Sequence, residues 1–161
     1  QRDSLTHLYN LEAGKYLADD YIKNFPSSKH ALIVLDVDHF KSVNDTFGHL
    51  VGNELLISLA NYLLVHNSDE DIVIRMGGDE FVIFIKETDK IQIQHRCEEL
   101  LNYLDEITLD HQDVPFSLSL GVYLFDHDIL FDDAFEFADE ALYQSKNNGR
   151  HRFTIHYQVE E

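Results

Sequence analysis

Apolar residues recur along the chain in two kinds of spacing. Four stretches repeat them every three or four positions, which predicts helices at residues 11–25, 50–65, 91–107 and 131–146, the third of them amphipathic. Other stretches carry continuous or alternating apolar runs, which predict strands at residues 31–35, 71–76, 80–86, 114–125 and 152–157. A short loop or helix containing Asn44 follows the first strand. Elements in this order predict an α/β fold with a mixed central sheet flanked by helices.

Glycine and proline mark few breaks between these elements. Gly77 and Gly78 separate two predicted strands and suit a tight hairpin, because both can adopt a positive φ. The chain has two prolines, seven glycines and no internal repeat, so we expect residues 1–161 to form a single domain. It begins with Gln1 rather than methionine, and we therefore expect it to be part of a longer protein.

The net charge of −18 narrows the classes of partner. A protein that binds nucleic acid through its phosphates needs a dense basic surface, so we expect no nucleic-acid partner. A nucleotide could bind only where local basic groups or a cation offset the acidic background. The apolar runs are too short to span a bilayer and no leader pattern opens the chain. We therefore expect a cytoplasmic segment without membrane contact, although the full-length protein could be tethered to a membrane. The single cysteine, Cys97, is expected to be a small buried side chain.

Acidic residues stand at the ends of two predicted strands. The first strand runs into Asp36, Val37 and Asp38, and Asp79 and Glu80 stand at the start of another. If these strands are neighbours, their carboxylates converge, and two carboxylates about 4 Å apart repel by roughly 4 kcal/mol at an effective dielectric near 20. Such a group requires a cation, and oxygen ligands of this kind suit Mg²⁺. The alternative is that each acid only marks where its strand reaches water.

Basic and amide side chains nearby are candidates for binding phosphates or a base. Lys41 closely follows the first acidic strand end, while Lys146 and Arg150 lie one helical turn apart at the end of the last helix. In so acidic a chain these cations are natural partners of a triphosphate. As the alternative, Lys41 is a solvated charge and the other two compensate the helix dipole. His49 and Asn53 are four residues apart and share a helix face.

Several motifs together resemble one known family. Residues 75–81 read RMGGDEF, and residues 35–56 read LDVDHFKSVNDTFGHLVGNELL. Further along the chain, residues 116–122 read FSLSLGV and residues 138–150 read ADEALYQSKNNGR. In this order and spacing the motifs resemble the GGDEF diguanylate cyclases over nearly the whole chain. The opening segment 3–10, DSLTHLYN, also resembles the family, although His7 and Leu11 stand where glycine and arginine are usual.

The resemblance implies a fold similar to the palm domain of nucleotide cyclases and polymerases, with the acidic strand ends side by side. It implies that Asp36, Asp79 and the Val37 carbonyl hold Mg²⁺, or Mn²⁺ in its place. Glu80 would be a further ligand or an acid–base group. Asp79 or Glu80 would help to deprotonate the 3′-hydroxyl of one GTP, which attacks the α-phosphate of a second and expels pyrophosphate. Lys41 would stabilise the charge that develops on the phosphates.

The resemblance also implies substrate contacts and partners. The residues expected to contact GTP are Phe40, Lys41, Asn44, His49, Asn53, Lys146 and Arg150. Of these, Asn44 and His49 would line the guanine and ribose, and the last two residues the γ-phosphate. Each domain of this family holds one GTP, so synthesis of cyclic di-GMP requires a homodimer with two-fold symmetry. An upstream domain of the full-length protein would regulate that dimerisation.

Two positions depart from the family pattern. Asn53 stands where aspartate is usual, and its amide offers guanine one acceptor and one donor instead of two acceptors. One guanine donor then loses its partner, at a cost of roughly 1–3 kcal/mol if it is buried. The hypothesis is weaker GTP binding or relaxed purine choice; the alternative is that a water or a rotated amide preserves guanine binding. The inhibitory RxxD motif is also incomplete, because Ser68 replaces its arginine while Asp71 is retained, so we expect no inhibitory product site.

Two other functions stay open on the sequence alone. A degenerate domain of the same fold could bind GTP as a sensor, or serve as a protein-interaction module, without turnover. Asn53 favours that alternative, whereas the retained Asp79, Glu80 and Lys41 favour catalysis. An acidic interaction domain of another class explains the composition but not the order of the motifs.

Overall fold

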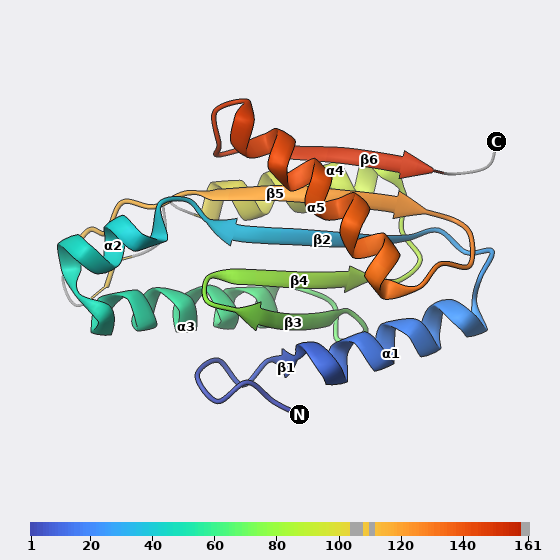
Figure 1. Ribbon diagram of the computed structural model, residues 1–161, viewed down its shortest axis with the longest axis horizontal. Helices are drawn as coiled ribbons and strands as arrows, with labels where there is room; N and C mark the ends of the chain where they lie inside the picture. Colours follow the sequence, from blue (N-terminus) through green and yellow to red (C-terminus); the bar gives the residue numbers. More distant parts are fainter. Residues whose placement is uncertain (104–107, 110–111, 159–161) are drawn as a thin grey trace.

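The computed structural model of the protein describes residues 1–103, 108–109 and 112–158, which form a six-stranded sheet with helices on both faces (Figure 1). The strands are β1 (Tyr9–Asn10), β2 (His30–Val37), β3 (Ile72–Gly77), β4 (Glu80–Ile85), β5 (Leu118–Phe125) and β6 (Phe153–Gln158). The helices are α1 (Leu11–Asn24), α2 (Phe40–Phe47), α3 (His49–His66), α4 (Lys90–Asn102) and α5 (Phe131–Asn147). Strands β1 and β6 pair in parallel with their neighbours and the central strands pair antiparallel. The predicted mixed α/β sheet is confirmed.

Strand β2 lies in the middle of the sheet, whose order is β1-β3-β4-β2-β5-β6. All eight of its residues are buried, which explains its continuous apolar run. It pairs antiparallel with both β4 and β5, so the adjacency that the sequence left open is settled. This pairing places the C-terminal end of β2 beside the starts of β4 and β5, at one end of the strands.

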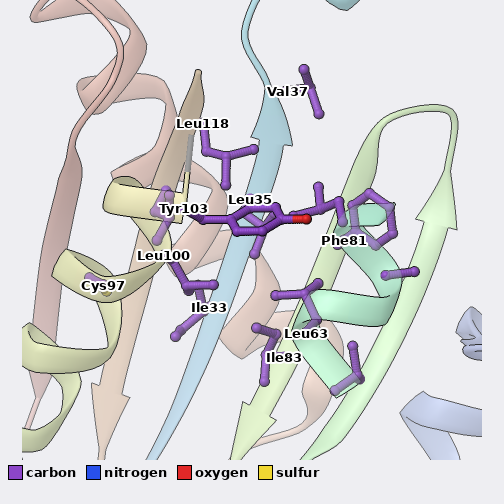
Figure 2. Packing of buried hydrophobic residues seen from close by; sticks show 14 of the residues in the cluster. Ile33, Leu35, Val37, Leu63, Phe81, Ile83, Cys97, Leu100, Tyr103 and Leu118 are labelled. Carbon is purple, nitrogen blue, oxygen red and sulfur yellow. The ribbon is translucent and has the colours of Figure 1, made fainter. Parts of the chain in front are cut away.

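The helices cover the sheet in two layers. Helices α2, α3 and α4 pack on one face, and α1 and α5 on the other (Figure 1). Figure 2 shows the first of these cores, in which Leu63 of α3 and Leu100 of α4 belong to one cluster with Ile33 and Leu35 of β2. Cys97 is fully buried in the same core, as expected, and burial raises the pKa of its thiol to about 12. The thiol is therefore neutral and serves as apolar packing.

Helix α5 lies close to the sheet because β5 carries a glycine where they cross. A Cβ at Gly121 would stand 2.2 Å from the Ala138 carbonyl oxygen and 2.1 Å from the Leu142 nitrogen, and these are backbone atoms that cannot move aside. Further along the helix, the Ser145 hydroxyl donates to the Leu120 carbonyl at 2.7 Å. This close approach holds the C-terminal end of α5 near the C-terminal end of β2.

The hairpin between β3 and β4 differs from its prediction. Its turn consists of Gly78 and Asp79 rather than of two glycines, because Gly77 pairs with Glu80 in the ladder. A register shift between Arg75 and Gly77 inserts an extra residue into β3 and moves the turn along the chain. Asp79 therefore lies in the turn at the tip of the hairpin, and Glu80 is the first residue of β4.

Other predicted elements are present with shifted ends. Strand β5 starts at Leu118 rather than at residue 114. The predicted helix 91–107 corresponds to α4, and its last residues, 104–107, lie outside the described part of the chain. The segment around Asn44 is helical, and the two-residue strand β1 was not predicted because so short an element has no period to detect. Among the described residues, no helix is both long and apolar enough to cross a membrane.

A buried histidine begins β2 at the opposite end from the acidic residues. His30 is 1% exposed; its Nε2 lies 2.9 Å from the Phe25 carbonyl oxygen, and its Nδ1 accepts the Glu87 backbone N–H at 3.1 Å. Because Nδ1 accepts, Nε2 carries the proton and donates, so the ring is neutral. Burial lowers the pKa of His30 below its usual value.

Candidate active site

The two predicted acidic strand ends lie side by side. Asp36 of β2 stands directly opposite Glu80 of β4 and, on its other side, opposite Ser119 of β5. Residues directly opposite in neighbouring strands share a face of the sheet, so the Asp36 and Glu80 side chains point to the face that α5 covers. Asp79, in the turn before β4, is close enough for its charge to act on both carboxyls.

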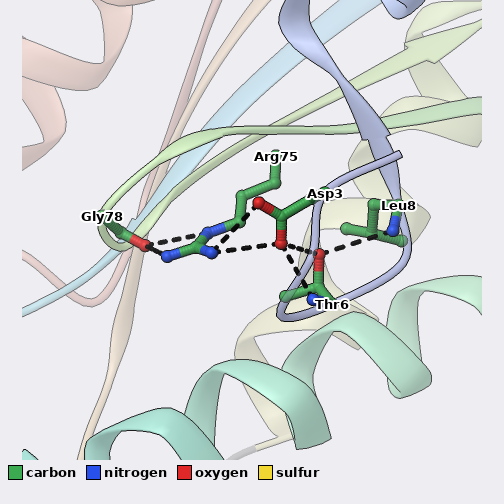
Figure 3. Close-up of polar contacts among 5 residues, drawn as sticks. All are labelled: Asp3, Thr6, Leu8, Arg75 and Gly78. Carbon is green, nitrogen blue, oxygen red and sulfur yellow. Dashed lines mark hydrogen bonds and ion pairs between the residues drawn. The ribbon is translucent and has the colours of Figure 1, made fainter. Parts of the chain in front are cut away.

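The turn that carries Asp79 is anchored by an arginine of β3 (Figure 3). Arg75 donates to the Gly78 carbonyl through Nε at 3.2 Å and Nη2 at 2.8 Å. Its Nη1 donates to both oxygens of Asp3, at 3.2 and 3.1 Å. Asp3 in turn accepts the Thr6 N–H at 2.8 Å and the Thr6 hydroxyl at 2.7 Å. The opening segment and the hairpin therefore form one hydrogen-bonded unit that fixes the backbone next to Asp79.

Burial raises the pKa of all three carboxyls, Asp36, Asp79 and Glu80, above their usual values. Repulsion from neighbouring carboxylates adds to this effect: Asp38 raises the pKa of Asp36 and of Asp79, and Asp139 of α5 raises that of Glu80. Lys146 acts in the opposite direction on each carboxyl. The ionised group is therefore electrostatically unfavourable on its own, and a bound cation would stabilise it.

Lys146 is a cation that the fold places on this group. Its Nζ lies 2.5 Å from Asp36 Oδ2. Burial works against its charge, but Asp36, with Glu80 and Asp79, raises the pKa of Lys146 above its usual value. The second oxygen of Asp36, Oδ1, is buried without a hydrogen-bond partner. A carboxylate oxygen that lacks a donor and lies beside other carboxylates is a suitable ligand for a divalent metal ion.

The donor set fits a metal ion that takes few ligands from the protein. Within the residues that the structure describes, no three His, Cys, Asp or Glu side chains gather so as to hold a metal ion on their own. Mg²⁺ is usually bound by one or two carboxylates together with substrate phosphates and water. Asp36 and Asp79, with the carbonyl of Val37 at the end of β2, can supply the protein part of such a set.

The residues expected to bind the base lie on α2 and α3. Asn44 packs on Gly52, since a Cβ at Gly52 would stand 1.8 Å from Asn44 Oδ1 and 3.3 Å from Phe40 Cζ. His49 and Asn53 are both exposed on α3. Sequence reasoning missed Gly52, and the signal that could have found it was a glycine inside a helix, where this residue is disfavoured.

Lys41 and Arg150, the other two basic residues expected to bind phosphate, differ in their surroundings. Lys41 is exposed on α2, whereas Arg150 is half-buried and its Nε lies 3.9 Å from Asp38 Oδ1. The structure thus brings Lys146 and Arg150 to the acidic residues at the end of β2 and leaves Lys41 on the surface. Asp38 was noted in the sequence only as one of the strand-end acids, because its contacts come from distant parts of the chain.

The segment in place of the inhibitory motif lies between α3 and β3. The Asp71 side chain is 4% exposed, and its Oδ2 accepts from the Ser68 N–H at 3.0 Å and from Arg96 Nη2 of α4 at 2.9 Å. Asp71 is therefore already paired within the chain, while Ser68, at the position of the missing arginine, is exposed.

Comparison with known proteins gives a consistent set of relatives. A family profile described as diguanylate cyclase, GGDEF domain, matches residues 1–152. Diguanylate cyclase DosC of Shigella sonnei (strain Ss046) is 37% identical over 130 residues, which cover 78% of this chain and 28% of that protein. The chain therefore spans less than a third of the length of this curated relative.

Solved structures share the fold described above. The GGDEF domain of DgcB from Caulobacter crescentus, solved in complex with c-di-GMP, aligns with a TM-score of 0.89 at 28% identity, covering 96% of this chain and 92% of that one. The active GGEEF domain of a diguanylate cyclase from Vibrio cholerae aligns with a TM-score of 0.83 at 32% identity, covering 94% of this chain and 99% of that one.

Proposed function

The chain belongs to the GGDEF domain family of diguanylate cyclases, and from this premise we propose that it condenses two GTP molecules into cyclic di-GMP with release of pyrophosphate. The observation that carries the proposal is the register of Asp36 against Glu80, with Asp79 in the adjoining turn and Lys146 over the group. These residues combine carboxylates that can bind a metal ion with a lysine that can bind phosphate. Phosphoryl transfer requires this combination.

Asp36, Asp79 and the Val37 carbonyl would hold Mg²⁺, with Mn²⁺ as the alternative ion. The bound ion would supply positive charge at the nucleotide phosphates. Asp79 or Glu80 would accept the proton of the 3′-hydroxyl. Burial raises the pKa of each carboxyl in the metal-free chain, and the positive charge of a bound ion would favour the ionised form that accepts a proton. The 3′-oxygen then attacks the α-phosphorus of the second GTP, and pyrophosphate leaves.

The phosphates and the base are bound by different elements. Lys41 of α2, Lys146 of α5 and Arg150 beyond α5 bind the triphosphate, which offsets its charge in this acidic chain. The base and ribose are bound by side chains of α2 and α3: Phe40, Asn44, His49 and Asn53. Asn44 keeps its place because Gly52 leaves room for it.

Turnover requires two copies of the domain. Each copy holds one GTP, so the 3′-hydroxyl held by one copy must meet the α-phosphate held by the other. Two reactions of this kind close the cyclic product, and a two-fold homodimer presents both pairs of groups at once. An upstream segment of the full-length protein regulates the pairing, and the reaction takes place in the cytoplasm, where GTP is available.

Product analysis on a forced dimer tests this proposal. The chain is fused to a dimeric coiled coil and incubated with Mg²⁺ and labelled GTP, and the products are separated by chromatography. We expect cyclic di-GMP and pyrophosphate, and neither from the equally dimeric Asp79→Asn variant. GTP binding without pyrophosphate release would instead support the alternative of a catalytically silent GTP sensor.

Asn53 bears on the choice of purine. An amide leaves one guanine donor without its acceptor, so Asn53→Asp should strengthen GTP binding by about 1–3 kcal/mol, which is roughly 5- to 150-fold in affinity. Turnover of the dimer with GTP, ATP and their mixture compares the two proteins. A wild-type enzyme that is strictly specific for GTP and is not improved by the aspartate would overturn this interpretation.

The pairing of Asp71 with Arg96 and with the Ser68 N–H supports a lack of product inhibition. The Asp71 carboxylate is already occupied, and the four residues carry no cation to clamp a dinucleotide. Adding cyclic di-GMP should leave the initial rate unchanged. Tight binding of cyclic di-GMP that is lost in Asp71→Asn would refute the prediction.

A further inference from the structure

The turn between α5 and β6 joins a regular helix end to two strained residues. The Arg150 N–H donates to the Ser145 carbonyl at 3.0 Å and the Gly149 N–H to the Lys146 carbonyl at 3.3 Å, which is the Schellman arrangement. Beyond this cap, Arg150 and His151 have positive φ values of 64° and 49°. Non-glycine residues seldom adopt this conformation, and two in succession persist only where the surrounding structure holds them.

The buried carboxylate of Asp38 contacts both strained residues. Its side chain is 1% exposed. Its Oδ2 accepts the His151 N–H at 3.2 Å and the Ser117 hydroxyl at 2.5 Å. Its Oδ1 accepts the Ser119 hydroxyl at 2.6 Å and lies 3.9 Å from Arg150 Nε. Asp38 therefore connects the end of β2, the start of β5 and the turn after α5.

We propose that Asp38 is a positioning residue that fixes the strained turn and thereby directs the Arg150 guanidinium toward the phosphate end of the nucleotide. This inference rests on the proposed function, in which Arg150 binds the γ-phosphate. The two serine hydroxyls orient the carboxylate so that one oxygen meets the His151 amide and the other faces the guanidinium. Both oxygens are thereby used within the chain, which distinguishes Asp38 from the metal-binding Asp36 with its unpartnered Oδ1.

The contact between Asp38 and Arg150 is a charge interaction without a direct hydrogen bond. At 3.9 Å the pair is too long for a direct hydrogen bond, in contrast to the 2.5 Å contact of Lys146 with Asp36. The Arg150 side chain is 42% exposed, which leaves it accessible to an incoming phosphate. The Asp38 charge holds the side chain in place without using the donors that the phosphate needs.

A double-mutant cycle on nucleotide affinity tests the inference. Calorimetry with Mg²⁺ measures binding to the full chain of GDP and of a GTP analogue with a methylene group between the α- and β-phosphorus atoms. The proteins are the wild type, Asp38→Asn, Arg150→Ala and the double variant. The wild type should prefer the triphosphate at least about tenfold over GDP, since a charged contact to the γ-phosphate is worth this much. Each single variant should lose most of that preference, and the double variant should lose no more.

The outcomes separate the inference from its premise. If the wild type binds both nucleotides equally, no γ-phosphate contact exists, and both the role of Arg150 and that of Asp38 are wrong. If Arg150→Ala loses the preference but Asp38→Asn keeps it, the proposed function stands and the positioning role is overturned. Equal weakening of both nucleotides in Asp38→Asn, or additive losses in the double variant, also overturns it, because either result indicates a general structural role.

A milder variant decides the matter if Asp38→Asn does not fold, as judged by its thermal unfolding. Ser117→Ala keeps the charge of Asp38 and removes one donor that orients Oδ2 toward His151. It should partly lower the preference for the GTP analogue over GDP in a protein that keeps Arg150. In the Arg150→Ala background it should have no effect on that preference. An unchanged preference in a folded Ser117→Ala protein overturns the inference.

Discussion

Replacing Lys146 with methionine should destabilise the metal-free protein. Methionine preserves the apolar stem but leaves Asp36 without its 2.5 Å contact to Nζ, beside an Oδ1 that already lacks a partner. Breaking a fully buried ion pair costs about 3–5 kcal/mol. The Lys146 side chain is 33% exposed, however, so solvent screening lowers the expected cost to about 1–2 kcal/mol.

A divalent ion bound at Asp36, or a proton on Asp36, should compensate for the loss of the Lys146 charge. A loss of about 1–2 kcal/mol lowers the melting temperature of a domain of this size by roughly 2–8 °C. Mg²⁺ should therefore raise the melting temperature more in Lys146→Met than in the wild type, where Nζ competes for the same carboxylate. Burial raises the pKa of Asp36 and Lys146 lowers it, so removing Lys146 raises that pKa further. The destabilisation should consequently shrink as the pH falls and Asp36 becomes protonated.

Thermal unfolding followed by circular dichroism measures these effects, at neutral and acidic pH, with a chelator or with Mg²⁺. Lys41→Met is the matched control, because Lys41 is exposed on α2 and its loss should leave the melting temperature unchanged. Equal melting temperatures and equal responses to Mg²⁺ in the wild type and Lys146→Met would refute the view that Lys146 balances the charge of Asp36.

Three further substitutions test other parts of the structure. Gly52→Ala drives a Cβ into Asn44 Oδ1, so it should weaken GTP binding in calorimetry, and wild-type affinity would contradict the assigned role of Asn44. Asp3→Asn removes the carboxylate that pairs with Arg75 and should lower the free energy of unfolding by about 1–3 kcal/mol in urea titrations; an unshifted midpoint would contradict this. The pKa of His30 lies below its usual 6.5 in the folded state, so its contribution to stability is present above that pH and is lost as the pH falls below it. The loss of stability between pH 7.5 and pH 5.5 should therefore be smaller in His30→Gln, and an equal loss would point to another group.

The fold was predictable because burial leaves periodic marks in the sequence. Strand β2 is buried on both faces and reads as a continuous apolar run, and the buried residues of α1 and α5 recur every three or four positions. The position of the hairpin turn could not be predicted, because it depends on a register shift between Arg75 and Gly77 rather than on local preference. The positive φ of Arg150 and His151 likewise depends on a carboxylate far away in the sequence.

The sequence predicted which acidic residues gather at the end of β2, but not the contacts that they make. The motifs identified Asp36, Asp79 and Glu80, and the resemblance supplied the adjacency that spacing alone left open. Lys146 pairs with Asp36 because of the place where α5 crosses the sheet. Gly121 determines that place, because it has no Cβ that would collide with the α5 backbone. A glycine in a strand indicates a close approach but does not say which segment approaches.

The central place of β2 affects how the site forms during synthesis of the chain. A nascent chain that ends after β4 already contains the three carboxylates but neither β5 nor the lysine that balances them. Such an intermediate presents one unpaired edge of β2 and an uncompensated patch of negative charge at its end. Pairing between segments so distant in sequence is slow, since much chain entropy is lost before the contacts form. The segment from β5 through α5 therefore covers the open edge of β2 and also brings in Lys146, so a chain that lacks this segment has neither the strand partner of β2 nor the cation that balances Asp36.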